Sequence, residues 1–159
     1  MKFNQLMHIA FFTKQMDEMI DFYCNRLGCR KKIVVRNKSY KGRADRPKMA
    51  ALAESDPEGI FNVYIEIADG QFIELFPAQE DQTEDVGWNR RLGYSHFSLT
   101  VDDIFETKKE LEEKGFIPDT QPSKGPSETW LMWLHDPDGN RFEIMQYTED
   151  SYQLKGHID

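Results

Sequence analysis

The sequence predicts an α+β fold built from two βαβββ modules, because three features of its first half recur in its second half. A β-rich run with a histidine leads into a helical segment that ends at a glycine, first from His8 to Gly28 and again from His96 to Gly115. The histidine and the glycine are separated by 20 positions in the first case and by 19 in the second. In each half, an Asp-Gly turn then opens a β-rich run that contains a glutamate. Such self-similarity indicates a duplicated structural unit.

The elements of the first half follow from periodicity and turn residues. The strand with His8 precedes a helix whose apolar residues recur at helical spacing, and Gly28 is placed to end that helix. Residues 61–76 form a predicted hairpin around Asp69-Gly70, in which a two-residue turn pairs Ile65 with Glu74. The helical face comprises Met16, Met19, Ile20, Tyr23 and Leu27.

The second half repeats this order with a shorter connection. A predicted strand over residues 93–101 carries His96, and the helix after it has Asp102 or Asp103 as its cap and Gly115 as its end. The first half holds 18 additional residues within 37–60, where a short helix is expected over 47–54. The resulting boundaries, within one domain overall, are a first module at 1–77, an acidic linker at 78–92, a second module at 93–147 and an aperiodic tail at 148–159.

Composition excludes several classes of function. The net charge of −8 argues against a nucleic-acid partner, because a phosphate backbone requires a basic surface. No apolar run is long enough to cross a membrane, and residues 1–5 do not resemble a secretory leader, so we expect a cytoplasmic protein. Residues 30–48 are locally basic, with nine Lys or Arg against Asp45. That segment is either a solvated loop beside a charged strand edge or a patch for an anionic substrate.

The duplicated histidines and glutamates predict a metal site. Strand alternation places His8 and His96 on the sheet face opposite the more uniformly apolar side chains, which we expect to carry the helices. A glutamate on an apolar strand requires a cation, because burial of an unpaired charge costs several kcal/mol or more on the order-of-magnitude scale for ions. Two imidazoles and two carboxylates suit a divalent transition metal. The predicted ligands are His8, Glu74, His96 and Glu143.

These motifs resemble the vicinal oxygen chelate superfamily, which includes glyoxalase I, acyl-CoA epimerases, extradiol dioxygenases and bleomycin-binding proteins. The stretches that carry the resemblance are HIAFFTKQMDEMIDFYCNRLG, QFIELFP, GYSHFSLTVDD and DPDGNRFEIMQ. It implies that the two modules form a half-open, barrel-like mixed sheet around a central metal cavity. One divalent ion is implied there, either zinc, nickel, cobalt, manganese or iron.

The His, Glu, His, Glu order is similar to that of glyoxalase I-like members. The resemblance therefore implies a lyase that converts the hemithioacetal of a 2-oxoaldehyde and a thiol into a 2-hydroxyacyl thioester through a metal-bound enediolate. Glu143 is the implied base, and Glu74 is the other ligand able to move and relay a proton. Two carboxylates neutralise a dication, which favours this redox-neutral reaction over the one-carboxylate site of extradiol enzymes.

The resemblance also suggests how a small-molecule substrate is bound. Lys124 corresponds to a lysine that contacts the carboxylate of the thiol, whereas Phe12 stands where glutathione-using members usually have an arginine. Tyr94 and Ser98 share the predicted face of His96 and complete the substrate-binding set. A homodimer is implied as well. The alternatives are an acyl-CoA epimerase, an extradiol dioxygenase and a non-catalytic binding or resistance protein.

Overall fold

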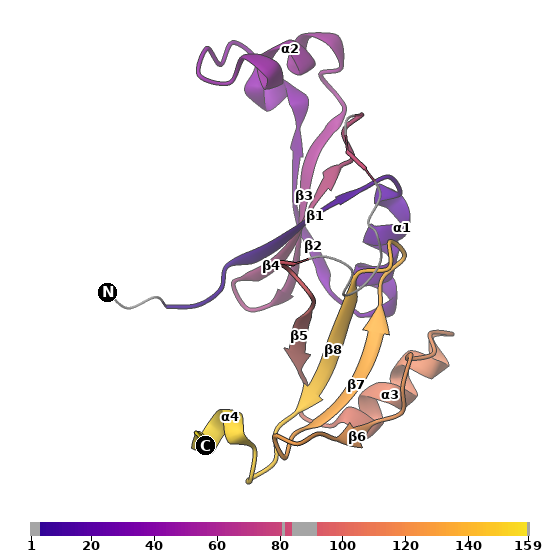
Figure 1. Ribbon diagram of the computed structural model, residues 1–159. Coiled ribbons are helices and arrows are strands. Elements are labelled where there is room, and N and C mark those ends of the chain that lie inside the picture. Colours follow the sequence, from indigo (N-terminus) through magenta and orange to yellow (C-terminus); the bar gives the residue numbers. More distant parts are fainter. Residues whose placement is uncertain (1–3, 81, 84–91, 159) are drawn as a thin grey trace. The chain divides into compact units, whose positions relative to one another are not determined.

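The computed structural model describes residues 4–80, 82–83 and 92–158, so most of the predicted linker at 78–92 lies outside the described residues. The chain divides into two compact units, Met1–Thr83 and Glu84–Asp159. Each unit contains four strands (Figure 1). They are β1 (His8–Thr13), β2 (Arg30–Arg36), β3 (Ile60–Ala68) and β4 (Gln71–Pro77) in the first unit, and β5 (Phe97–Thr100), β6 (Ser123–Lys124), β7 (Trp130–His135) and β8 (Arg141–Gln146) in the second.

The two sheets have the same topology. Their strand orders are β1-β4-β3-β2 and β5-β8-β7-β6. In each, the first strand pairs in parallel with the last, and the other neighbours are antiparallel. Neither sheet closes into a barrel over the residues described. The α+β class and the duplicated βαβββ order are thus confirmed.

The helix after β1 presents the face that the sequence predicts. It begins as α1 (Met16–Asp21) and continues as a π-helical turn over Phe22–Arg26. Met19 and Tyr23, from the centre of the predicted apolar face, are fully buried. The segment then ends at Gly28, whose φ of +76° is a conformation that glycine adopts without a steric penalty.

The β3–β4 hairpin forms around Asp69-Gly70 as predicted, but its register is different. Ala68 does pair with Gln71, whereas Glu74 pairs with Tyr64 and not with Ile65. The cause is an irregularity between Glu66 and Ala68, which inserts one extra residue into β3. Because side chains alternate between faces, this shift moves Glu74 away from the apolar residues of β3 and onto the face of Tyr64.

The second unit also differs from the prediction at its first strand. The expected strand over 93–101 is confined to β5, so His96 directly precedes the strand. The helix that follows, α3 (Ile104–Glu113), is capped by Asp103, whose side chain accepts hydrogen bonds from the backbone N–H groups of Phe105 and Glu106 at 2.9 and 3.0 Å. Gly115, with φ +76°, follows its end as predicted.

In both units, the apolar core lies on the sheet face opposite the histidine. The helix of each unit contacts that sheet: α1 contacts β4, and α3 contacts β7 and β8. Helical side chains such as Met19 in the first unit and Ile104 in the second are fully buried. The strand residues in these cores are Val63, Ile65, Ile73 and Leu75 in the first unit, and Met132, Leu134, Phe142 and Ile144 in the second.

The additional residues of the first half form a short helical region at the end of the β2–β3 pair (Figure 1). It contains a 3-10 turn over Asn37–Tyr40 and the helix α2 (Pro47–Ser55), which starts at a proline as expected. Among the described residues, no helix is long and apolar enough to cross a membrane.

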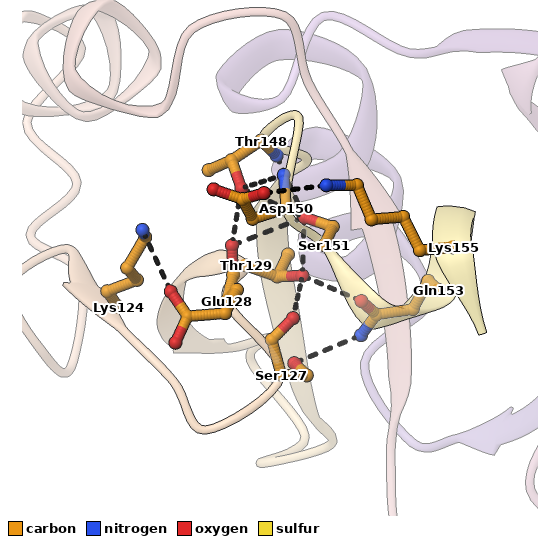
Figure 2. Close-up of polar contacts among 9 residues, drawn as sticks. All are labelled: Lys124, Ser127, Glu128, Thr129, Thr148, Asp150, Ser151, Gln153 and Lys155. Carbon is orange, nitrogen blue, oxygen red and sulfur yellow. Dashed lines mark hydrogen bonds and ion pairs between the residues drawn. The ribbon is translucent and has the colours of Figure 1, made fainter. Parts of the chain in front are cut away.

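The segment after β8, aperiodic in sequence, is anchored to the loop between β6 and β7 (Figure 2). It ends in the short helix α4 (Tyr152–Lys155). The buried Thr129 hydroxyl donates to Ser151 Oγ at 2.9 Å, and Thr148 Oγ1 donates to the carbonyl of Glu128 at 2.7 Å. Glu128 has a φ of 58°, which is uncommon for a residue other than glycine. Hydrogen bonds from the tail therefore hold a loop residue in an unfavourable backbone conformation.

Candidate functional site

The first predicted ligand pair lies where β1 meets β4. Ala10 of β1 is the register partner of Glu74, so His8, two residues earlier, shares the face of Glu74. His8 Nε2 lies 3.3 Å from Glu74 Oε2. The other ring nitrogen, Nδ1, lies 2.9 Å from the sulfur of Met7. The structure thus brings together the two ligands predicted for the first half.

Two residues that sequence analysis missed hold the Glu74 carboxylate. Glu74 is 5% exposed, and its Oε1 accepts a hydrogen bond from Asn62 Nδ2 at 2.5 Å. Tyr64 is the register partner of Glu74 and lies on the same face of the sheet. Burial, followed by the interaction with Glu74, raises the pKa of Tyr64 to about 12. Asn62 and Tyr64 are two residues apart on β3, so they share one face of the sheet. The extra residue between Glu66 and Ala68 is what places that face on the same side as Glu74.

The second predicted pair occupies the equivalent place between β5 and β8. Ser98 is the register partner of Glu143, and His96 lies two residues before Ser98. His96 Nε2 lies 3.5 Å from Glu143 Oε2. Sequence analysis missed Ser95, whose Oγ lies 3.1 Å from His96 Nδ1, and gave no role in this pair to Trp133, whose ring packs edge-on against His96 with the centroids 4.8 Å apart.

The two pairs fit a divalent metal in chemistry and in spacing. Two ligand atoms on one ion stand about 3.0–3.4 Å apart when the bonds are about 2.1 Å and the angle is about 90–109°. The observed nitrogen–oxygen distances of 3.3 and 3.5 Å are close to that range. In the described part of the chain, metal-ligating side chains do not gather in groups of three or more. Each unit therefore supplies two of the four predicted ligands.

Two of the predicted substrate-binding residues lie on the same faces as these pairs. Phe12 is four residues after His8 on β1, so the two side chains point to the same face of the sheet. Phe12 is exposed, and its ring centroid lies 5.5 Å from that of Phe76. Ser98 is exposed beside Glu143, its register partner. Both are accessible to a small molecule.

The other two predicted substrate-binding residues have partners within the second unit. Burial, followed by the charge of Asp136, raises the pKa of Tyr94 to about 12. Lys124 Nζ lies 3.0 Å from Glu128 Oε2 (Figure 2). An incoming carboxylate would thus compete with Glu128 for Lys124.

Acidic side chains pair with several cations of the basic segment at 30–48, but four carboxylates offset only part of the charge of nine Lys and Arg. The solvated loop with a charged strand edge and the anionic-substrate patch therefore both stay predictions. The ion pairs of the segment join Arg30 and Lys32 to Glu66, Lys38 to Glu58, Lys41 to Glu54, and Arg43 to Asp45.

Comparison with known proteins identifies the family. The model of the glyoxalase/bleomycin resistance protein/dioxygenase superfamily matches residues 5–144, which include both histidine–glutamate pairs. The chain belongs to this superfamily. The resemblance noted in the sequence is therefore confirmed, and the two sheets of this superfamily member are its duplicated modules.

Individual relatives of this superfamily member are distant. A probable lactoylglutathione lyase of Synechocystis sp. is 26% identical over 147 residues, which cover 89% of this chain and 94% of that protein. A probable chloroplastic lactoylglutathione lyase of Arabidopsis thaliana is 25% identical over 90% of this chain, which spans 36% of that protein's length. The crystal structure of a glyoxalase family protein from Enterococcus faecalis superposes with a TM-score of 0.65 at 19% identity, covering 90% of this chain and 98% of the other.

Proposed function

We propose that this protein is a metal-dependent lyase of the glyoxalase I type. The observation that carries the proposal is the repeated pair: at equivalent register positions, each unit brings one histidine nitrogen within 3.3 or 3.5 Å of one glutamate oxygen. Membership of the superfamily and the names of the two distant relatives support the same reaction class. The proposed substrate is the hemithioacetal of a 2-oxoaldehyde and a thiol, and the product is a 2-hydroxyacyl thioester.

In this proposal, His8, Glu74, His96 and Glu143 together hold one divalent ion. The ion, when bound, supplies Lewis-acid polarisation of the substrate oxygens. The two carboxylates balance its charge, and the two imidazoles are the nitrogen ligands that such ions prefer. Phe12 and Ser98, exposed on the same faces as the ligands, contact the substrate.

Glu143 is the proposed base. Its carboxylate takes the proton from the carbon that bears the sulfur, and the electron pair of that C–H bond forms the double bond of an enediolate. Return of the proton to the neighbouring carbon gives the thioester. Hydrogen and electrons are only redistributed within the substrate, so no redox cofactor is required.

Lys124 gives the proposal a specificity element. Its ammonium group is a suitable partner for a carboxylate on the thiol, provided that this carboxylate displaces Glu128. Phe12 offers an apolar contact instead of a second cation. We therefore propose a thiol with a single anionic contact at Lys124.

The test is to measure metal binding and hemithioacetal turnover together. We expect the protein, after chelator treatment, to bind one divalent ion and to convert a hemithioacetal of methylglyoxal only in its metal-loaded form. His96→Ala should weaken metal binding strongly. His135→Ala is the matched control, because His135 is bonded to Asp119 at 2.7 Å and is not a proposed ligand.

Each contrary result has a separate meaning. If no divalent ion binds, or if His96→Ala binds it as tightly as His135→Ala does, the four-ligand site is wrong. If the ion binds but hemithioacetals of several thiols are inert, the reaction is wrong. Oxygen consumption by the ferrous form would favour a dioxygenase instead. The homodimer and the cytoplasmic location stay predictions. Light scattering tests the homodimer.

A further inference from the structure

The two repeats differ in the residues that surround their glutamates. Tyr64 is the register partner of Glu74, and Trp133 is the register partner of Glu143. Two positions earlier on the same strands, the first repeat has Asn62 and the second has leucine. Because leucine carries no polar atom, a polar pair faces the glutamate in the first repeat only.

This difference changes how firmly each carboxylate is held. Glu74 receives a hydrogen bond from Asn62 and faces its register partner Tyr64, and its side chain is 6% exposed. The Glu143 side chain is 13% exposed. Beside it, the Trp133 ring packs against the ring of His96. The first carboxylate is therefore the more restrained of the two.

Asn62 is poorly explained by packing alone. Its Oδ1 atom is buried and has no hydrogen-bond partner among the residues the structure describes. An unsatisfied buried acceptor costs free energy, whereas an apolar side chain of similar size would not carry that cost. The hydrogen bond from its Nδ2 to Glu74 gives the residue a role that leucine, at the equivalent position 131, cannot fill.

We propose that Asn62 and Tyr64 are positioning residues that hold the Glu74 carboxylate in one orientation and so make Glu74 the more firmly fixed of the two carboxylate ligands. This inference rests on the proposed function, because it requires a bound metal. It gives Glu74 a fixed role in place of the mobile, proton-relaying role expected from the sequence.

The test uses Co²⁺ as the probe, because its visible absorption reports the ligand geometry. We expect Asn62→Leu and Tyr64→Phe each to weaken Co²⁺ binding about 10- to 100-fold and to change the spectrum, as is typical when a residue behind a ligand is removed. Asn37→Leu is the matched control. Asn37 is also buried with an unpaired Oδ1, but its Nδ2 donates to the carbonyl of Asp56 at 2.8 Å. It should lower thermal stability and leave Co²⁺ affinity unchanged.

A second comparison tests the asymmetry itself. Glu74→Gln should reduce Co²⁺ affinity more than Glu143→Gln does, because the hydrogen bond from Asn62 orients the Glu74 carboxylate before the metal binds. Equal losses in these two variants would overturn the inference. So would Asn62→Leu and Tyr64→Phe variants that bind Co²⁺ as Asn37→Leu does.

Failure of the inference and failure of the proposed function are distinguishable. If the unchanged protein does not bind Co²⁺, or if binding survives both His8→Ala and His96→Ala, the metal site and the inference are both wrong. If binding is lost in the histidine variants but persists in Asn62→Leu and Tyr64→Phe, only the positioning role is wrong.

Discussion

Single residues beside the candidate ligands contact them directly. Asn62 donates a hydrogen bond to Glu74, Tyr64 is the register partner of Glu74, and Ser95 Oγ lies 3.1 Å from His96 Nδ1. A hydrogen bond at one imidazole nitrogen fixes the orientation of the ring and leaves the other nitrogen for a metal. A serine adjacent to a histidine is common in any sequence, so this role becomes visible only in the structure.

Ser95→Ala tests that role. We expect it to weaken divalent-metal affinity about 10-fold, because the His96 ring loses the partner that orients it. Ser98→Ala is the comparison: Ser98 is exposed on the same face and is a proposed substrate contact, so it should raise KM and leave metal affinity unchanged. Titration calorimetry with zinc and steady-state kinetics measure the two effects. A loss of metal affinity in both variants would contradict the distinction.

At the scale of elements, one carboxylate joins the edge strand β2 to β3. Glu66 of β3 is bonded to both Arg30 and Lys32 of β2. The hydrogen bond from Lys32, followed by that from Arg30, lowers the pKa of Glu66 from 4.5 to about 2. Most side chains of β2 are exposed, so polar links of this kind contribute to holding the strand in place.

This link predicts a pH-dependent stability. The folded-state pKa of Glu66 is lowered, so its contribution is fully present above 4.5 and is lost as the pH falls to about 2. We expect Glu66→Gln to melt at a lower temperature than the unchanged protein at neutral pH. The difference in melting temperature should vanish near a pH of about 2. Glu54→Gln, which removes an exposed carboxylate 3.8 Å from Lys41, should change little at either pH. A difference that does not depend on pH would exclude the ion pair as its cause.

The predictable part of the fold follows from patterns with a direct physical meaning. Helical spacing indicated that Met19 and Tyr23 are core residues, and Asp69-Gly70 identified a turn. The duplicated pattern also identified the histidine–glutamate pairs. The extra residue in β3 could not be predicted, because no glycine or proline marks it. The contacts of Glu74 with Asn62 and Tyr64 depend on that local shift, so they were missed.

At the scale of the whole molecule, duplication places one histidine–glutamate pair in each unit. Glu74 pairs in register with β1 and Glu143 with β5, at equivalent points of the two sheets. If both pairs hold the same ion, that ion is bound by residues of both compact units. Binding energy would then be shared across the chain, and each unit would depend on the other for metal affinity.

Metal stoichiometry tests this link. We expect one ion per chain and a rise in Tm on metal addition, equivalent to about 2.7 kcal/mol at a metal concentration of 100 times Kd. His8→Ala or His96→Ala, in different units, should each diminish binding of that same ion. Two ions per chain, with either variant abolishing only one of them, would show independent sites. Equilibrium dialysis and calorimetric melting distinguish the two cases.

The anchored tail has a consequence for where a functional fragment of this protein ends. The superfamily model stops at residue 144, within β8. Beyond that point, Thr148 and Ser151 both donate to the backbone carbonyl of Glu128, which keeps the left-handed conformation of that residue and with it the loop that follows Lys124. A chain truncated at the family boundary would lose both donors. A recombinant fragment therefore needs to extend at least through Gln153 to preserve this loop.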